Sequence, residues 1–347
     1  MQFDQLKRRD FIPLIGSAAT WPLAACDHSV RTFGRPNTYA IAFSPDGRTC
    51  LSGAGDGSLI LWDLATGKVL LDFFTDSLAV NTVAFSPDGR TTLSGGNSSK
   101  VKLWDIATGK RLRNFWDPAI VLRTGESNSE PHAQWAHFAS VTSVAFSPDG
   151  RSALSGSWSS EGEDAVLKLW EVATGKPIRA FTGQSQTVQS VAFSLDGLTA
   201  LSGSPLRLWD VATGKELRTL TPGGKSVAFS PDGLTALTDR LTLVDVATGK
   251  ELRSFADSSA VNAVAFSPDG RTTLSGGWTP AYPELLQFLL GLENEGTVRL
   301  WELATGKQLR SFKGHSGSVH SVAFAPDGRS ALSGGYDGIR LWDLTGS

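Results

Sequence analysis

The apolar positions of the chain recur in one fixed order, as short runs separated by turn residues. A run of small and apolar residues ends in Phe and is followed by Ser-Pro-Asp-Gly or a close variant, and later by Leu-Trp-Asp and Ala-Thr-Gly-Lys. Pro presets φ and Gly tolerates a positive φ, so each Pro-Asp-Gly predicts a tight turn between two strands. Short runs bounded by such turns predict β-strands rather than helices.

The pattern occurs seven times, which predicts a repeat architecture. The Phe-to-Gly starts lie at 43–47, 85–89, 146–150, 193–197, 229–233, 266–270 and 324–328. Six of the units end on a Trp, at Trp62, Trp104, Trp170, Trp209, Trp301 and Trp342. Val244 stands in place of Trp in the fifth unit, and Leu195 replaces the turn Pro in the fourth.

Each unit predicts four short strands, a to d. Examples are 143–146 for strand a, 331–333 for strand b, 298–302 for strand c and 252–255 for strand d. One such sheet buries neither face alone, so neighbouring sheets must stack against each other.

The Trp-Asp ending, the Gly314-His315 pair and the preceding strand pattern together resemble the WD40 repeat family over residues 29–347. The resemblance implies an all-β, seven-bladed propeller with four antiparallel strands per blade around a central channel. It also implies a non-catalytic scaffold that binds other proteins. The chain divides into a targeting segment, 1–27, and one propeller domain, 28–347.

The two ends of the propeller predict how the ring closes. The last unit stops after strand c, within 342–347, whereas 29–33 matches the strand d sequence at 309–312. We therefore expect the N-terminal strand to complete the last blade, which removes the exposed edges that two unpaired ends would leave.

The first 27 residues have the order of an export signal. Three basic residues at 7–9 precede an apolar stretch at 11–25, which is too short to span a bilayer. The start of this segment resembles a bacterial twin-arginine signal, and 23–26 resembles a lipobox, which makes Cys26 a candidate for lipidation. This predicts a periplasmic or membrane-anchored protein of the cell envelope. A plain signal-peptidase cut, or an unprocessed tail on a cytoplasmic protein, remains open.

Composition and charge narrow the function further. The net charge of −2 gives no basic surface of the kind that nucleic-acid binders carry, so we expect no nucleic acid among the partners. Two cysteines make no disulfide framework, and Cys50 reads as a small packed residue.

The resemblance also implies hydrogen-bonded side-chain sets that fix blade geometry. One set is His315, Ser333, Asp337 and Trp342, and the other is His137, Ser155, Asp164 and Trp170. In other units the His position is assigned to Asp76, Gln184, Leu220 and Asp257. A His beside a Ser and an Asp could be read as a catalytic triad, but a structural role is favoured.

Other catalytic signals are weak. The segment 223–226 is similar to the end of a phosphate loop but has Thr219 where that loop requires Gly. No Cys or His cluster has metal-ligand spacing. We therefore expect no catalytic residues, cofactor or metal. The alternative is a propeller enzyme or a small-ligand-binding protein that uses the channel mouth.

Length variation predicts where a partner binds. Three connections are enlarged, at 116–139, 157–165 and 278–296, and all lie on the face that carries the b–c and d–a connections. Insertions on one face of a repeat array usually mark the binding face. The candidate partner-binding rim consists of Trp116, Trp135, Phe138, Trp158, Trp278, Tyr282, Leu286, Phe288 and Leu289.

Two details of this rim stay open. The 278–296 insertion is either a lid packed on the propeller or an exposed patch that docks a protein or, through 284–292, a membrane. The fourth and fifth units have very short b–c connections, at 204–205 and 239–240, which predicts a notch in the rim above them.

Overall fold

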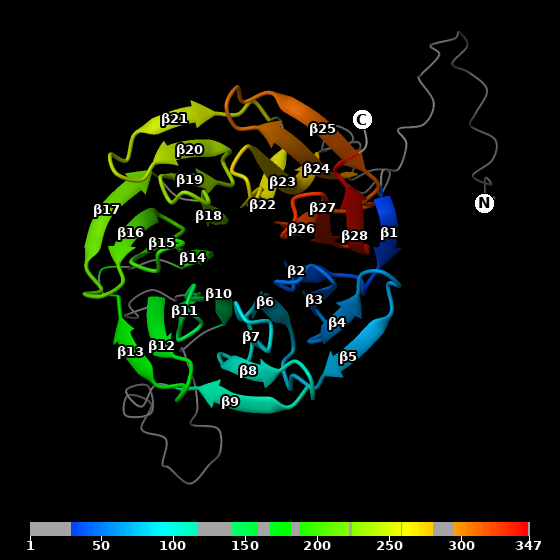
Figure 1. The fold of residues 1–347 in the computed structure, drawn as a ribbon, viewed down its shortest axis with the longest axis vertical. Helices are drawn as coiled ribbons and strands as arrows, with labels where there is room; N and C mark the ends of the chain where they lie inside the picture. Colours follow the sequence, from blue (N-terminus) through cyan, green and yellow to red (C-terminus); the bar gives the residue numbers. More distant parts are fainter. Residues whose placement is uncertain are drawn as a thin grey trace, which may run out of the picture.

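The computed structural model describes residues 29–116, 140–158, 167–181, 183, 187–221, 224–257, 259–279 and 295–345. These residues form seven four-stranded antiparallel sheets, and no helix occurs among them. Figure 1 shows the sheets arranged as blades around a central opening, with the first strand of each unit innermost. The predicted all-β, seven-bladed propeller is confirmed.

The strands of blades one to three follow the chain in order. Blade one contains β2 (Thr38–Phe43), β3 (Thr49–Ala54), β4 (Leu59–Asp63) and β5 (Val69–Phe73). Blade two contains β6 (Val80–Phe85), β7 (Thr91–Gly96), β8 (Val101–Asp105) and β9 (Arg111–Phe115). Blade three contains β10 (Val141–Phe146), β11 (Ser152–Ser157), β12 (Leu167–Glu171) and β13 (Pro177–Ala180).

Blades four to six follow the same order. Blade four contains β14 (Val191–Phe193), β15 (Thr199–Ser202), β16 (Leu206–Asp210) and β17 (Glu216–Thr221). Blade five contains β18 (Val227–Phe229), β19 (Thr235–Thr238), β20 (Thr242–Asp245) and β21 (Glu251–Ser254). Blade six contains β22 (Ala260–Phe266), β23 (Thr272–Thr279), β24 (Glu295–Glu302) and β25 (Gln308–Lys313).

Blade seven joins the two ends of the chain. It contains β26 (Val319–Phe324), β27 (Ser330–Gly335), β28 (Gly338–Asp343) and, as its outer strand, β1 (Ser29–Phe33). β1 pairs antiparallel with β28, with Phe33 opposite Ile339 and Thr32 opposite Arg340. Figure 1 shows the blue first strand beside the red last one. The predicted closure by the N-terminal strand is therefore confirmed.

The core lies between the blades, where an aromatic pair recurs. A Phe at the end of the outer strand of one blade, or one residue from it, contacts the strand c Trp of the next blade. At the closing junction Phe33 and Trp62 have ring centroids 5.5 Å apart. The other pairs are Phe73–Trp104, Phe115–Trp170, Phe181–Trp209, Phe255–Trp301 and Phe312–Trp342, at 5.4 to 5.9 Å. Such pairs stabilise a core by about 0.5 to 1.5 kcal/mol beyond their buried area.

The junction between blades four and five differs. Leu220 and Val244 occupy the Phe and Trp positions there and pack in one aliphatic cluster. In blade four, Thr219 of β17 pairs with Arg207, and Leu220 is the next residue. In blade six, Ser311 pairs with Arg299, and Phe312 is the next residue. Leu220 therefore occupies the position of the Phe. Assigning Leu220 to the His position was therefore wrong, because the missing Phe shifted the alignment of this unit.

Hydroxyl groups on the inner strands bond neighbouring blades together. Ser143 Oγ accepts a hydrogen bond from the backbone N–H of Val191 at 3.0 Å. Equivalent bonds join Thr82 to Val144, Ser190 to Val227, Ser226 to Val264 and Ser321 to Ile41. At the two remaining junctions the corresponding residues are Ala40 and Ala263. Five of the seven junctions therefore carry this bond.

The hairpins of blades four and five are short, as predicted. Leu201 pairs with Leu208 and Leu237 with Leu243, whereas the equivalent pair in blade two is Leu93 and Leu103. The inner strands β14 and β18 have three residues each, against six in β6. A notch in the rim above these blades remains a prediction.

Candidate interaction surface

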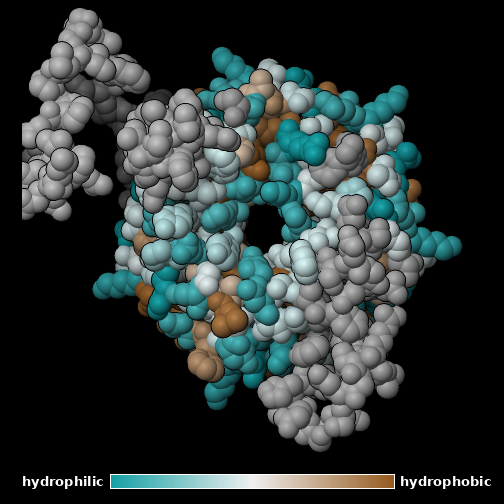
Figure 2. All heavy atoms as spheres, turned by 180° about the vertical axis from the view of Figure 1, so that it is seen from behind, coloured by the Kyte–Doolittle hydropathy of each residue, from teal (hydrophilic) through white to brown (hydrophobic). Residues whose placement is uncertain are grey.

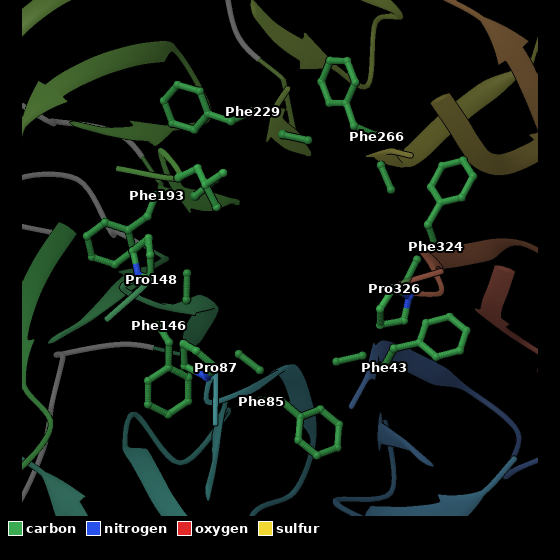
Figure 3. Close-up of a pocket in the computed structure, with 18 of the residues that line it drawn as sticks. Phe43, Phe85, Pro87, Phe146, Pro148, Phe193, Phe229, Phe266, Phe324 and Pro326 are labelled. Carbon is green, nitrogen blue, oxygen red and sulfur yellow. The ribbon is translucent and has the colours of Figure 1, made fainter. Parts of the chain in front are cut away.

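The central channel is the candidate site for catalysis or for small-ligand binding. A cavity of about 810 Å³ is lined by the ends of all seven inner strands and the turns that follow them. The labelled Phe rings point away from the open centre (Figure 3). Among the described residues that line this cavity, none has a titratable side chain. The cavity therefore supplies no acid, base or charged ligand from that part of the chain.

The serines at the cavity mouth are used by their own turns. Ser44 Oγ donates to Asp46, and Ser44 Oγ also accepts from the backbone N–H of Thr49 at 3.0 Å. The hydrogen bond from Ser44, followed by that from the Arg48 amide, lowers the pKa of Asp46. The same arrangement recurs around Ser86, Ser147, Ser194, Ser230 and Ser267. The repeated Ser and Asp therefore build the turns.

Blade seven brings its predicted side-chain set together. His315 Nδ1 bonds Asp337, His315 Nε2 lies 2.6 Å from Ser333 Oγ, and Trp342 Nε1 donates to the same Oγ at 2.7 Å. Because the ionised Asp337 carboxylate can only accept, His315 donates its Nδ1–H to it. In this tautomer Nε2 accepts, so the Ser333 hydroxyl donates to Nε2 while its oxygen accepts from Trp342. Hydrogen bonds therefore connect Trp342 on strand c, through Ser333 and His315, to the Asp337 carboxylate.

Electrostatics and burial fit a structural role for this set. Burial acts to raise the pKa of Asp337, but hydrogen bonds from His315, the Ser316 amide and Arg340 outweigh it and hold the pKa far below its ordinary value. Ser333 is 0% exposed, and the His315 side chain is 1% exposed. A nucleophile must meet its substrate, so a Ser that is sealed in the blade cannot act as one.

The second predicted set is described only in part. Trp170 Nε1 donates to Ser155 Oγ at 2.7 Å, whereas His137 and Asp164 lie outside the described residues. At the corresponding connections of blades two and six, an Asp replaces the His and pairs with a base on strand c. Asp76 bonds Lys102, and Asp257 bonds Arg299. An ion pair thus takes the place of the His bond in these blades.

Only part of the predicted rim lies within the described residues. Trp116 follows β9, is partly buried and donates its backbone N–H to the Gly175 carbonyl at 3.3 Å. Trp158 follows β11 and is 53% exposed, whereas Trp278 in β23 is partly buried. Trp135, Phe138, Tyr282, Leu286, Phe288 and Leu289 lie outside the described residues, as does Cys26. The rim therefore stays a prediction.

The structure adds exposed apolar residues that sequence reasoning missed. Phe74 and Leu78, on the connection from β5 to β6, are 87% and 84% exposed. On the opposite set of turns, Leu195, Leu198 and Leu234 are 64% to 70% exposed in blades four and five. The other five blades have Arg at the position of Leu198 and Leu234, so this departure from the repeat was the available signal. The turn face is less uniform than its motif indicates.

The described residues contain no helix that is long and apolar enough to cross a membrane. Within the same part of the chain, no group of three or more His, Cys, Asp or Glu side chains is placed to hold a metal ion. Cys50 is buried, and this burial raises the pKa of its thiol.

Comparison with known proteins places the repeats in a family. The family model for the WD domain, G-beta repeat matches residues 24–63, 68–105, 129–171, 175–210, 249–302 and 306–343. The longest stretch without a match, 211–248, contains three of the four strands of blade five, β18 to β20, where Val244 replaces Trp.

Several named proteins share short stretches with this chain. The small ribosomal subunit protein RACK1 of Dictyostelium discoideum is 40% identical over 70 residues, which cover 18% of this chain and 21% of that protein. The serine-threonine kinase receptor-associated protein of Gallus gallus is 48% identical over 46 residues, 13% of each chain. RACK1 of Candida albicans is 40% identical over 87 residues, 21% of this chain and 26% of that protein. The match to each of these relatives spans about a quarter of its length or less.

The fold and the comparison agree. The structure has seven blades built from one repeated unit and a ring closed by the N-terminal strand, and six family matches cover most of the chain. The chain belongs to the WD40 repeat family.

Proposed function

We propose that this protein is a non-catalytic scaffold that holds other proteins on the face carrying the enlarged connections. The observation that carries this proposal is the contrast between the channel and the connections. The described lining of the channel has no titratable group, whereas bulky apolar side chains such as Phe74, Leu78 and Trp158 stand exposed on the connections between strands. Exposed apolar groups that lie together, as Phe74 and Leu78 do at one cavity, are typical of protein-binding surfaces.

The relatives support the same reading. One is named for a place in the small ribosomal subunit and another for association with a kinase receptor, and both names describe proteins that work in assemblies. Binding to other proteins is therefore the function we carry over to this chain, without a particular partner.

We further propose that the protein acts at the bacterial cell envelope. The basic residues at 7–9, the apolar stretch after them and the 23–26 segment support export, and Cys26 is the proposed point of lipidation. Lipid anchoring at Cys26 would hold the propeller close to the membrane, since β1 begins at Ser29.

Two experiments test these proposals separately. Affinity capture compares the full chain with a variant in which 280–294 is replaced by a short Gly-Ser linker. Loss of captured proteins from a folded variant supports the scaffold, and an unchanged set contradicts the role of this insertion.

Fractionation of cells that express wild-type, Arg8→Lys/Arg9→Lys and Cys26→Ser chains tests the location. Unchanged cytoplasmic protein in all three contradicts export.

A further inference from the structure

We propose that the connection between β5 and β6 is a docking site for a peptide segment that carries a bulky apolar side chain next to Lys or Arg. This inference rests on the proposed scaffold function and names the chemistry of one partner segment. The site consists of Phe74, Leu78 and the acidic side chains around them, and is called the 74–78 site below.

Phe74 and Leu78 are the two most exposed large apolar side chains in the described part of the chain, at 87% and 84%. The fold does not require them. In the connection to blade six, Ala256 directly follows the outer-strand Phe, and Ser259 lies two residues before the Val of the next strand. In the connection to blade seven the matching residues are Lys313 and Gly317. Small or polar residues therefore serve the same turn elsewhere.

The backbone that presents these two side chains is held in place. Thr75 is buried, and its Oγ1 donates to the Gly57 carbonyl at 2.5 Å. Ser77 Oγ donates to the Ala79 carbonyl at 2.8 Å, and the buried Lys102 bonds the Thr75 carbonyl. A surface that is already ordered loses little conformational entropy on binding. Two exposed apolar groups on such a backbone are well placed to bind a partner.

The site is hollowed, and its excess negative charge lies at Asp56 and Asp72. A cavity of about 520 Å³ is lined by Phe74 and Leu78 together with Arg35, Asp56, Asp72 and Asp76. Three carboxylates and one guanidinium line this cavity, and the Lys102 and Arg111 side chains bonded to Asp76 bring the formal charge of the whole set to 0. Asp76 is already bonded to Lys102 and Arg111. Asp56 and Asp72 share Arg35, each at 3.5 Å, and their side chains are about half exposed.

This arrangement selects the chemistry of the occupant. Asp56 and Asp72 together carry one more negative charge than Arg35 neutralises, so a Lys or Arg of the partner completes the set. An apolar side chain next to that base can cover Phe74 and Leu78. The face shown in Figure 2 is mostly hydrophilic (teal), with hydrophobic (brown) groups among the hydrophilic ones. Anionic lipid is disfavoured at Asp56 and Asp72, because these two carboxylates would repel it.

Peptide binding to the full chain tests the proposal. The probe is a short fluorescein-labelled peptide that alternates Leu and Lys, and the matched probe has Glu in place of Lys. We expect fluorescence anisotropy to show roughly tenfold tighter binding of the Lys peptide, an advantage that added salt reduces. Phe74→Ser/Leu78→Ser should weaken the Lys peptide roughly tenfold, and Asp56→Asn/Asp72→Asn should narrow the difference between the peptides. Leu217→Ser/Leu252→Ser, on the outer strands β17 and β21, is the matched control and should bind as the wild type does.

Three results would overturn the proposal. These are equal binding of both peptides, equal weakening by the control variant, and binding to anionic vesicles that needs Phe74 and Leu78 while the Lys peptide does not bind. The result is separable from the scaffold test. If protein capture depends on 280–294 but not on Phe74 and Leu78, and the Lys peptide does not bind, the scaffold proposal is supported and the 74–78 site is contradicted. If the Lys peptide binds but no protein is captured, the 74–78 site is supported and the scaffold proposal is contradicted.

Discussion

Trp342 donates its indole N–H to Ser333 Oγ at 2.7 Å, and the same Trp-to-Ser bond occurs in every blade except the fifth. Each of these bonds joins the next-to-last residue of strand c to strand b, and both partners are buried. In blade seven the hydroxyl serves a second partner, His315, so one oxygen satisfies two buried groups. The cost of losing this oxygen should therefore depend on the blade.

Ser333→Ala is expected to lower the free energy of unfolding by about 2 to 3 kcal/mol, because both His315 and Trp342 lose a buried partner. Ser52→Ala removes the oxygen that accepts only from Trp62, at 2.8 Å, and should cost about 1 kcal/mol. Urea unfolding of the two variants gives the comparison. Equal losses would contradict the two-partner role of Ser333.

In blade five, removal of the equivalent hydroxyl is expected to raise the free energy of unfolding rather than lower it. Thr238 Oγ1 is buried and has no hydrogen-bond partner among the described residues, because the Val244 side chain lacks the N–H that Trp donates in the other blades. Thr238→Val keeps the side-chain shape and removes the unpaired hydroxyl, so we expect stability to rise by about 1 kcal/mol. Ser275→Ala, which removes the acceptor of Trp301, is the control and should lower stability. A loss in Thr238→Val would show that the hydroxyl is bonded in solution.

Asp337 links stability to pH. Its folded-state pKa lies far below the ordinary value of 3.8, so its stabilisation is fully present above that value and is lost as the pH falls below it. Asp337→Asn should lower the free energy of unfolding by about 2 kcal/mol at pH 7, and the difference from wild type should shrink as the pH is lowered below about 4. Denaturant unfolding at several pH values measures this. A difference that stays constant down to pH 2 would contradict the assignment.

Blade five should also open most readily. The junction between Leu220 and Val244 lacks the aromatic pair found at the other six, and β18 to β21 have only three or four residues each. We expect the amide of Leu237 in β19 to exchange with deuterium faster than the amide of Leu154, its equivalent in β11. Equal protection of the two amides would show that aliphatic packing alone closes this junction.

The repeat made most of the fold predictable from the sequence. Pro-Asp-Gly turns, Trp-Asp endings and the match between 29–33 and 309–312 are local signals, and together they specify seven blades and the closing strand. The error at Leu220 arose where the local signal weakened, since this unit has neither the Phe nor the Trp that fixes the alignment.

The surface was less predictable. Phe74 and Leu78 stand near an outer strand, where apolar residues are usually core, and only the arrangement of the connection shows that they face solvent. The hydrogen bonds between blades depend on how one inner strand lies against the next, a relationship that no pattern within one unit encodes.

Those bonds between blades give the last prediction. Ser143→Ala removes the acceptor for the Val191 amide and should lower the free energy of unfolding by about 1 kcal/mol, with the ring otherwise unchanged. Ala263→Ser places a hydroxyl at the junction between blades six and seven, where it can accept from the Val322 amide as Ser226 accepts from that of Val264. This variant should gain up to about 1 kcal/mol, so the two substitutions shift the urea midpoint in opposite directions. If both lower stability, the inner hydroxyls do not stabilise the junctions by hydrogen bonding, because the added and the removed group would then act through packing alone.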